Sequence, residues 1–358
     1  MKNNYVRFDE AINKTLHSEM LRNKKTIYFG LGADDASRIF NTTTGLREKY
    51  GNERVFDTPI SENSMTGVAV GMCLNGFSTI MSHQRMDFFL LAMDQMVNSA
   101  AKWNFMFGNQ NKINMTIRLI VGRGWGQGPT HSQNLQSWFA HIPNLKIVSP
   151  SFPSTATALL SQSIRDPSPT LFIENRWCHQ LKEDIESHHE NNKKIKIGKA
   201  NLLNKGKDLT IVTISYSTIE LLKCYDILKK NKINFDHLDL LSIKPLDING
   251  IIKSVKKTGK LLILDNSSHE ICSIGSEILS KIIQKNKSIF KSEPKLLFLP
   301  DVHQPTSFYL TKDFFISKKV LVSSIFNLVG KKFNINEIKE DKFHDIIEDQ
   351  KIFKFKTH

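Results

Sequence analysis

The chain has 358 residues, which is long enough for two domains that each bury a core of their own. The formal net charge is +14, but the lysines are scattered through the later two thirds of the sequence and form no single basic stripe, which argues against a nucleic-acid binding protein. The four cysteines lie far apart without a CxxC or Cys/His cluster, so the sequence predicts neither a zinc site nor a disulfide framework and fits a reducing compartment.

The N-terminal segment has no apolar signal core, and no window reaches the roughly 18 uncharged apolar residues that a membrane span needs. We therefore expect a soluble, cytoplasmic protein without a membrane partner. Residues 6–22 have the apolar spacing of a helix, and the segment "KKTIYFGLGADD" that follows is typical of a strand with a glycine-rich exit.

Strands and helices then alternate along the first half of the chain. A small-residue helix is predicted at 63–77 and a longer helix at 88–107, with the strand "STIMSH" between them. Further strands are predicted at "NMTIRLIVGRG", "KIVSP" and "PTLFIENR". Such alternation is typical of a mostly parallel sheet with helices on both faces.

The pattern restarts after a polar, lysine-rich segment at 186–207, which we interpret as a linker. Four strand-like runs follow, "LTIVTISYS", "FDHLDLLSI", "KLLILDNSS" and "PKLLFLPD", separated by three helical stretches. The sequence thus predicts an α/β protein with two three-layer α/β/α domains, at 1–185 and 208–330, and a charged C-terminal tail at 331–358.

Three segments at the carboxyl ends of predicted strands are candidates for chemistry, because open parallel sheets bind ligands there. Glu62, in "VFDTPISENSM", stands before the small-residue helix, where an acid can simply be exposed or cap the helix. "GRGWGQGPTHSQ" combines a close-approach glycine loop with the titratable His131, or is only a flexible loop. "HQRMDFF" contains Phe88, which is either a stacking surface or part of the core.

Several of these motifs together resemble a known family. "VFDTPISE", "AMDQMVNSAAKW", "HSQ" with "SWFAHIPNLKIVSP", and "SIRDPSPTLFIEN" occur in the order found in the beta subunit of the first component of 2-oxo acid dehydrogenase complexes, of the pyruvate and branched-chain type. The second half, with "DLLSIKPLDINGIIKSVKKTGKLLILD" and "LPDVHQP", resembles the C-terminal domain of the same transketolase-like superfamily. The resemblance implies a pyrimidine-binding domain followed by a transketolase C-terminal-like domain.

The resemblance also implies a cofactor, thiamine diphosphate, and assigns residues to it. Glu62 would hydrogen-bond the N1′ atom of the aminopyrimidine ring and favour the imino tautomer of the ring, whose 4′ nitrogen can then take the proton from thiazolium C2. Phe88 would pack on the pyrimidine. His131 would face the substrate and help to position its carboxylate or the acyl acceptor.

Two further assignments have plain alternatives. By the resemblance, Arg85 lies near the substrate site, at a place where many relatives carry an uncharged residue. It would pair with a carboxylate or phosphate of the substrate or form a supporting salt bridge. Asp166 matches a turn that holds a structural potassium ion in some relatives, but an aspartate before a proline is also an ordinary turn residue.

The sequence departs from the family at the first strand exit, where Ala33 replaces an acid, and in the glycine loop, where Arg123 and Trp125 suggest a substrate other than pyruvate. No "GDG" stretch occurs, although thiamine enzymes use it to hold the diphosphate through magnesium. A separate alpha subunit would therefore supply magnesium in an alpha2beta2 assembly, and a lipoyl acyltransferase would accept the acyl group. The alternatives are an alpha/beta enzyme with a non-lipoyl acceptor and a non-catalytic homologue.

Overall fold

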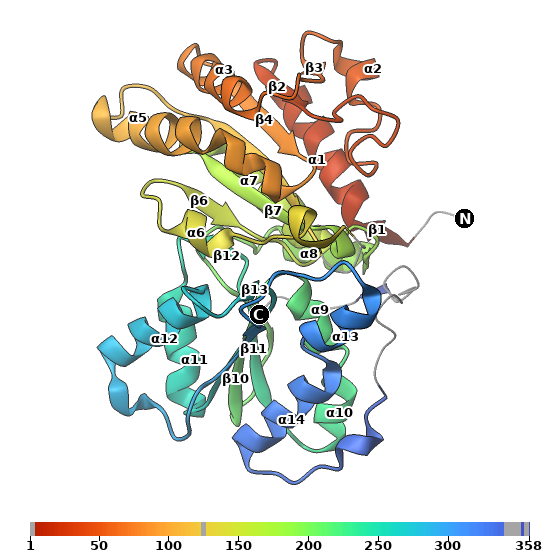
Figure 1. Ribbon diagram of the computed structural model, residues 1–358, viewed down its shortest axis with the longest axis vertical. Helices are drawn as coiled ribbons and strands as arrows, with labels where there is room; N and C mark the ends of the chain where they lie inside the picture. The colour runs from red at the N-terminus through yellow and green to blue at the C-terminus, as the bar shows by residue number, and fades with distance from the viewer. Residues whose placement is uncertain (1–3, 123–126, 340–351, 354–357) are drawn as a thin grey trace.

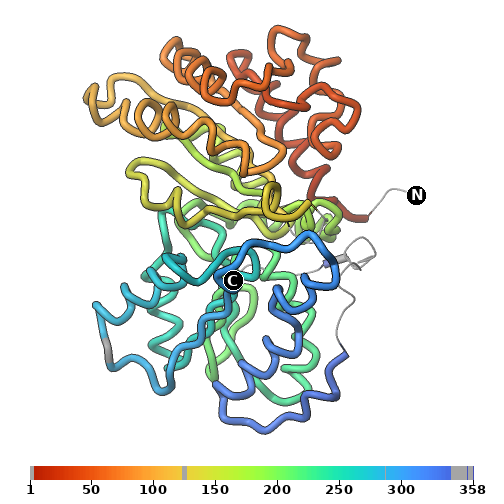
Figure 2. The backbone as a smooth tube through the Cα atoms, in the orientation of Figure 1, coloured from red at the N-terminus to blue at the C-terminus, as the bar shows by residue number. Residues whose placement is uncertain are grey.

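The computed structural model describes residues 4–122, 127–339, 352–353 and 358. It contains two α/β units, with the N-terminal half of the chain in the upper unit of Figure 1 and most of the C-terminal half in the lower one. The tube in Figure 2 follows the chain from the red and yellow upper unit into the green and blue lower unit. The expectation of two α/β domains with mainly parallel sheets is confirmed.

The upper sheet has seven strands in the order β12-β6-β7-β5-β4-β2-β3. All neighbouring pairs are parallel except β12 with β6. Since β12 belongs to the C-terminal half of the sequence, the second half supplies an edge strand to the first sheet. The strands are β2 (Thr26–Gly30), β3 (Val55–Phe56), β4 (Ser78–His83), β5 (Met115–Val121), β6 (Lys146–Val148), β7 (Thr170–Asn175) and β12 (Ser242–Lys244).

Successive side chains of the upper strands enter two different cores, as the period of two in a strand requires. In β2, Ile27 and Phe29 belong to one core and Tyr28 belongs to the other. The first core is closed by α3 and the helical segments that follow β4, and the second by α1 and α7. The helices of this unit are α1 (Phe8–Arg22), α2 (Leu46–Tyr50), α3 (Glu62–Leu74), α4 (Met86–Phe89), η1 (Leu90–Ala92), η2 (Gln95–Ala100), α5 (Ala101–Met106), η3 (Gly128–His131), α6 (Gln136–Ala140), α7 (Pro153–Arg165), η4 (Arg176–Cys178) and α8 (Ile185–Asn192).

The lower sheet has five strands in the order β14-β13-β10-β11-β9, and only β9 is antiparallel to its neighbour. Its strands are β9 (Asn201–Asn204), β10 (Leu209–Thr213), β11 (Phe235–Asp239), β13 (Leu261–His269) and β14 (Lys295–Leu299). Helices α11 and α12 close one face, and α9, α10 and α14 close the other. The helices are α9 (Tyr216–Leu222), α10 (Tyr225–Lys230), α11 (Ile248–Thr258), α12 (Ile274–Lys285), η5 (Lys287–Ile289), α13 (Phe308–Phe314), α14 (Lys318–Val329) and η6 (Ile335–Glu337).

A third sheet brings the two ends of the chain together. β1 (Tyr5–Arg7) and β15 (Ile352–Phe353) both pair with β8 (Lys182–Asp184). Phe353 is buried, and its ring centroid lies 5.9 Å from that of Phe152. A part of the tail predicted at 331–358 therefore packs on the upper unit, whereas 340–351 and 354–357 lie outside the described residues.

The segment 186–207, which the composition suggests is a linker, contains most of α8 and all of β9. Its polar residues are partly buried: Asn191 is 1% exposed, and its Nδ2 atom donates to Glu183 Oε1 (3.2 Å). The segment therefore has the polar composition of a linker because its polar side chains form hydrogen bonds inside the fold. Within the described residues, no helix is long and apolar enough to cross a membrane.

Buried polar contacts join the two units. Gln136 Nε2 donates to Asp265 Oδ2 (2.5 Å), and Ser151 Oγ donates to Asp239 Oδ1 (2.8 Å). Both carboxyl groups are fully buried. Burial raises the pKa of Asp239 to about 7 and that of Asp265 to about 6. The junction between the units therefore contains two acids whose pKa values are raised toward neutral pH.

Asp239→Asn is expected to make the thermal stability less dependent on pH. The ordinary pKa of an aspartate is about 4, and in the folded protein that of Asp239 is raised to about 7. Stabilisation by this proton is therefore complete below about pH 4 and is lost as the pH rises through about 7. The asparagine keeps the shape of the protonated acid. Circular dichroism melts at about pH 5 and about pH 8 should show a smaller fall for the variant than for the wild type.

The matched control is Asp226→Asn on α10, where the side chain is exposed. Its melting temperature should follow that of the wild type at both pH values. An equal fall for Asp239→Asn and the wild type would contradict the assignment of the proton to Asp239.

Candidate functional site

Four polar side chains lie beyond the carboxyl ends of parallel strands in the upper sheet. Glu62 follows β3, Arg85 follows β4 and His131 follows β5. Arg176 follows β7 directly. These strands run parallel within one sheet, so their carboxyl ends share one edge, where open α/β sheets bind ligands.

Glu62 is the first residue of α3 and is only 6% exposed. Ser61 occupies the N-cap position without a side-chain capping bond, and Thr66 Oγ1 donates to the main-chain carbonyl of Glu62 (2.8 Å), not to its carboxyl group. Among the described residues, no group forms a hydrogen bond or ion pair with this carboxyl group. The helix dipole stabilises an acid at this place, but a buried carboxyl also requires a hydrogen-bond partner. Glu62 is neither an exposed loop residue nor a capping residue.

Phe88 in α4 and His131 in η3 contact each other. Their ring centroids are 5.4 Å apart, and the rings are nearly perpendicular at 87°. The two segments are also joined by Asp87 Oδ1, which accepts hydrogen bonds from Gln133 Nε2 (2.9 Å) and from the Gln133 main-chain nitrogen (3.3 Å). His131 Nδ1 lies 2.7 Å from Thr130 Oγ1, which sets the orientation of the imidazole. The structure thus brings together two of the residues that the sequence assigned to one site.

Arg85 lies at the N-terminus of α4, one turn before Phe88. Its Nε and Nη2 atoms donate to Gln127 Oε1 (3.0 and 2.8 Å), and Nη1 donates to the carbonyl oxygen of Gln84 (2.6 Å). The guanidinium carbon is 5.6 Å from the Phe40 ring centroid. Burial lowers the pKa of Arg85 from its ordinary value. Since Gln127 directly precedes η3, Arg85 ties the β4 exit to the segment of His131.

Arg176 was not found by the sequence analysis. It is half-buried, and its guanidinium carbon lies 4.5 Å from the same Phe40 ring. Burial lowers its pKa, and its positive charge in turn contributes to the lowered pKa of Arg85. Its position as the last residue of the predicted strand "PTLFIENR" is the signal that could have identified it.

Phe40 is held in place by a buried hydrogen-bond network. Arg118 of β5 is fully buried and donates to both carboxyl oxygens of Glu174 in β7 (2.8 and 3.0 Å). It also donates to the hydroxyl groups of Tyr28 (2.8 Å) and Thr42 (2.9 Å). Because Thr42 belongs to the loop after β2, this arginine fastens the Phe40 loop to the sheet.

Asp166 lies apart from the other predicted residues. It follows α7 and precedes β7, which places it at the amino end of this strand. Lys146 Nζ donates to Asp166 Oδ2 (2.5 Å), and the main-chain nitrogen of Ser168 donates to Oδ1 (2.9 Å). The prediction of a potassium ion here stays a prediction. Within the described residues, no cluster of three or more His, Cys, Asp or Glu side chains forms a metal site.

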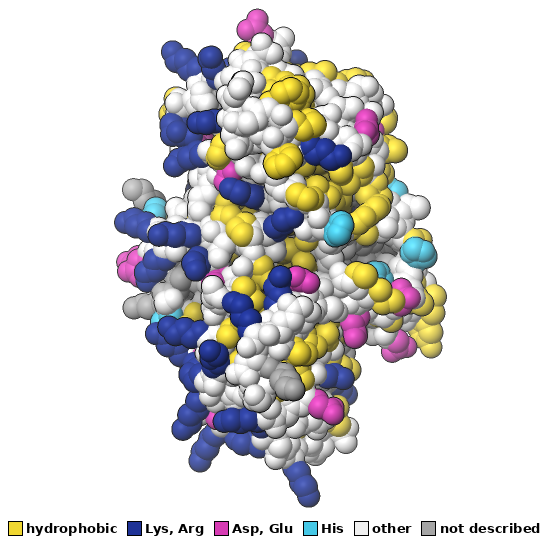
Figure 3. All heavy atoms as spheres, turned by 90° about the vertical axis from the view of Figure 1, so that its left-hand side faces the viewer, with side chains coloured by type: hydrophobic (Ala, Val, Ile, Leu, Met, Phe, Trp, Pro, Cys, Tyr) yellow, Lys and Arg dark blue, Asp and Glu magenta, His cyan; other side chains and the backbone are white. Residues whose placement is uncertain are grey.

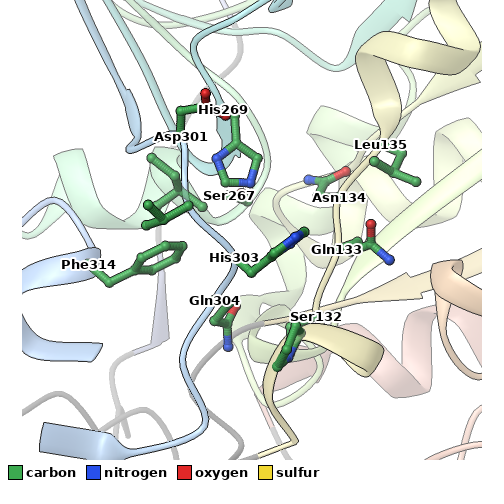
Figure 4. A pocket seen from close by; sticks show the side chains of 13 residues that line it. Ser132, Gln133, Asn134, Leu135, Ser267, His269, Asp301, His303, Gln304 and Phe314 are labelled. Atoms are coloured by element: carbon green, nitrogen blue, oxygen red, sulfur yellow. The ribbon is translucent and has the colours of Figure 1, made fainter. Parts of the chain in front are cut away.

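A cavity of about 230 Å³ lies beside η3, between the two units (Figure 4). One side is formed by residues 132–135, and the other by His269 at the end of β13 and by His303 and Gln304 after β14. Gln304 is 8% exposed, and its side-chain nitrogen has no hydrogen-bond partner in the part of the chain that the structure describes. The cavity is a recess next to the predicted substrate segment, and both polar and apolar side chains line it. Arg123 and Trp125, which the sequence analysis also singled out, lie outside the described residues.

Comparison with known proteins identifies the family. The pyrimidine binding domain of transketolase matches residues 5–178, and the C-terminal domain of transketolase matches residues 198–320. The pyruvate dehydrogenase E1 component subunit beta of Rickettsia bellii is 34% identical over 303 residues, which span 85% of this chain and 92% of the relative. This chain belongs to the E1 beta subunit family.

Other E1 beta relatives are equally similar. The pyruvate dehydrogenase E1 component subunit beta of Chaetomium thermophilum is 37% identical over 273 residues, with 76% of this chain and 71% of the relative covered. The acetoin:2,6-dichlorophenolindophenol oxidoreductase subunit beta of Cupriavidus necator is 33% identical over 325 residues, with 88% and 94% covered. Among solved structures, a split gene transketolase, an inactive beta4 tetramer, shares the fold, with a TM-score of 0.72, 20% identity and coverage of 92% of this chain and 99% of that chain.

Arg118→Met is expected to destabilise the E1 beta fold by about 3–5 kcal/mol, because removing one partner leaves the carboxylate of Glu174 buried without a counter-charge. The midpoint of urea unfolding, followed by fluorescence, measures the loss. The matched control is Arg22→Met. Arg22 is half-exposed and pairs with Glu19, and Glu19 would still pair with Arg165 in the variant. This surface change should cost less than about 1 kcal/mol. Equal midpoints for the two variants would show that the buried Arg118–Glu174 pair contributes no more to stability than the surface pair.

Proposed function

We propose that this chain is the beta subunit of a thiamine diphosphate-dependent 2-oxo acid dehydrogenase, which decarboxylates a 2-oxo acid oxidatively and transfers the acyl group to a lipoyl group. The family match supports the class of enzyme. The observation that carries the proposal for this chain is Glu62, a residue only 6% exposed whose carboxyl group has no protein partner among the described residues, at the start of a helix in a pyrimidine-binding domain.

Residues of this chain would hold the aminopyrimidine half of the cofactor. The carboxyl group of Glu62 suits a ring nitrogen, since a hydrogen bond to that nitrogen would satisfy a buried acid that otherwise remains unpaired. Phe88 offers an aromatic surface at the same edge of the sheet, and His131 contacts Phe88 and keeps its Nδ1 atom near Thr130. When bound, thiamine diphosphate supplies the carbon nucleophile and the electron sink for decarboxylation.

His131 would position the substrate and exchange protons with it. Its imidazole is half-buried, so it can contact a ligand and still reach solvent. The Asp87–Gln133 hydrogen bonds hold the segment after His131 against α4, which restricts the orientation of the imidazole relative to Phe88. Such fixed placement is what general acid–base catalysis requires.

An alpha subunit would complete the site. The sequence has no "GDG" stretch for the magnesium diphosphate group. The upper unit also exposes large apolar side chains on the surface of α3, η1 and α5, and Figure 3 shows hydrophobic side chains gathered over this unit. Exposed apolar patches of this kind are typical of protein interfaces. The residues of this α3–α5 surface are Val68 (49% exposed), Leu91 (62%), Phe105 (89%) and Met106 (52%).

A second candidate is an alpha/beta thiamine enzyme that transfers its acyl or ketol unit to an acceptor other than lipoamide. The similarity to a subunit named for acetoin and not for pyruvate favours it. A non-catalytic homologue is the third alternative, and the buried, unpaired Glu62 argues against it, because a protein without the chemistry gains nothing from this costly acid.

Glu62→Gln is expected to leave the alpha/beta assembly intact and to slow hydrogen–deuterium exchange at cofactor C2 by about 100-fold or more, since the amide keeps the shape but loses the proton exchange. NMR of the reconstituted complex with thiamine diphosphate measures the exchange, and gel filtration checks the assembly. The control is Glu53→Gln, an exposed acid just before β3. Exchange in Glu62→Gln at the wild-type rate would show that Glu62 has no role in cofactor activation.

The isolated chain is expected to show no tight binding of thiamine diphosphate with magnesium in calorimetry, because it carries only the pyrimidine half of the proposed site. Addition of the alpha subunit should produce the tight site. Phe105→Asp should weaken the complex, since it places a charge on the α3–α5 surface. Tight cofactor binding by the isolated chain would rule out the subunit assignment.

A further inference from the structure

Two arginines from different strands lie over one aromatic ring at the carboxyl edge of the upper sheet. Arg85 follows β4 and Arg176 follows β7, and their guanidinium carbons are 5.6 and 4.5 Å from the centroid of Phe40. A phenyl ring at these distances stabilises each cation and restricts the movement of its side chain. The ring itself belongs to the loop that Arg118 fastens through Thr42.

The acidic side chains nearest to Arg176 form hydrogen bonds with other arginines. Both carboxyl oxygens of Asp9 accept hydrogen bonds from Arg7 (2.9 Å each), and both oxygens of Glu174 accept from Arg118 (2.8 and 3.0 Å). Within the described residues, the guanidinium group of Arg176 itself makes no hydrogen bond or ion pair. Five N–H donors of a half-buried cation are therefore available for a ligand.

Arg85 adds a second positive charge beside the same ring. Its Nε and Nη2 atoms donate to Gln127, and its Nη1 atom donates to the carbonyl oxygen of Gln84. Asp87 is close enough to favour the charge of Arg85, but burial and the charge of Arg176 oppose it, and the net effect lowers the pKa of Arg85. Burial likewise lowers the pKa of Arg176. The surroundings thus favour an added negative charge at this point.

We propose that Arg176 and Arg85, oriented by Phe40, bind an oxyanion at the far end of the substrate. This inference rests on the proposed function and narrows its substrate to a 2-oxo acid that carries a second anionic group, either a carboxylate or a phosphate. A planar guanidinium matches both groups because it can donate two parallel hydrogen bonds to two oxygens. Arg176 is then a specificity-determining residue.

The position of the two arginines suits this role. Arg85 lies one helical turn before Phe88 and hydrogen-bonds Gln127, which directly precedes the η3 segment of His131. The anion site and the Phe88–His131 pair are therefore neighbours on α4 and η3. A substrate held at its far end by the arginines would present its 2-oxo group to the Phe88–His131 pair. Binding at the far end would thus orient the reacting group.

The test uses the complete alpha/beta complex and three 2-oxo acids: pyruvate, 2-oxoglutarate with a terminal carboxylate, and 3-phosphohydroxypyruvate with a phosphate. The wild type should prefer one of the two dianionic acids over pyruvate in kcat/KM, and which one it prefers identifies the oxyanion. Arg176→Met should reduce this preference by about 10- to 100-fold, mainly through KM, the amount expected when a charged group loses its hydrogen bonds.

A binding measurement without turnover provides a second readout. Calorimetry of the complex with glutarate and with inorganic phosphate, neither of which can be decarboxylated, should detect the anion that matches the preferred substrate. Arg176→Met should weaken this binding by about tenfold or more. If Arg176→Met fails to fold, Arg176→Lys keeps the charge but loses the two-pronged hydrogen bonding, and it should show the same loss at a smaller size.

The matched control is Arg54→Met. Arg54 is also stacked on an aromatic ring, 5.0 Å from the Tyr50 centroid, but it precedes β3 and lies at the opposite, amino edge of the sheet. Its removal should leave the ratio of kcat/KM values between the dianionic acid and pyruvate unchanged.

Two outcomes would overturn the inference. One is a wild-type preference for pyruvate, and the other is an equal loss on all three substrates in Arg176→Met, which would mark the arginine as structural. If the proposed function itself were wrong, the result would differ: the complex would bind thiamine diphosphate but consume none of the three acids. The calorimetry with glutarate and phosphate would then decide on the anion site alone.

Discussion

The candidate site depends on one fully buried guanidinium group, that of Arg118. Taking the charges of Arg118 and Glu174 out of water costs several kcal/mol, and this cost is offset only when the remaining donors also find partners. Tyr28 and Thr42 provide these partners. The network therefore joins the three strands β2, β5 and β7 to the loop that carries Phe40, and it fixes in advance where the ring stands relative to both strand exits. Preorganisation of this kind is what a binding site for a charged group requires.

The sequence predicted those parts of the molecule that have a local signal. The alternation of strand-like runs with helices identified two α/β domains, and ordered motifs identified the family; both are confirmed by the fold and the comparisons. Motif position also placed Phe88 and His131 in one site, and the two rings are in contact. Glu62 was singled out by its place after a predicted strand and by the resemblance; the residue is 6% exposed, and its role stays a prediction.

Other parts have no local signal. The role proposed for Arg176 depends on its contact with Phe40, which is distant in the sequence. The parallel order of the sheet brings the two residues together. The segment 186–207 has a polar composition because its side chains bond inside the fold, so α8 and β9 could not be distinguished from a linker. The segment 88–107 satisfies a helical pattern throughout, but the structure divides it into α4, η1, the π-helical η2 and α5, because packing against α3 and the sheet decides the local hydrogen bonding.

Strand β12 has a consequence for the way in which this protein can be built and altered. It leaves the lower unit to complete the edge of the upper sheet, and Lys244 in it donates to the carbonyl oxygens of Ala140 and Ile142. If the two halves were expressed as separate chains, the edge of β6 would be exposed and the hydrogen bonds from Lys244 would be lost. An exposed strand edge promotes aggregation. The two halves match separate family models but share the upper sheet in the folded state, so we expect them to fold best when they are expressed as a single chain.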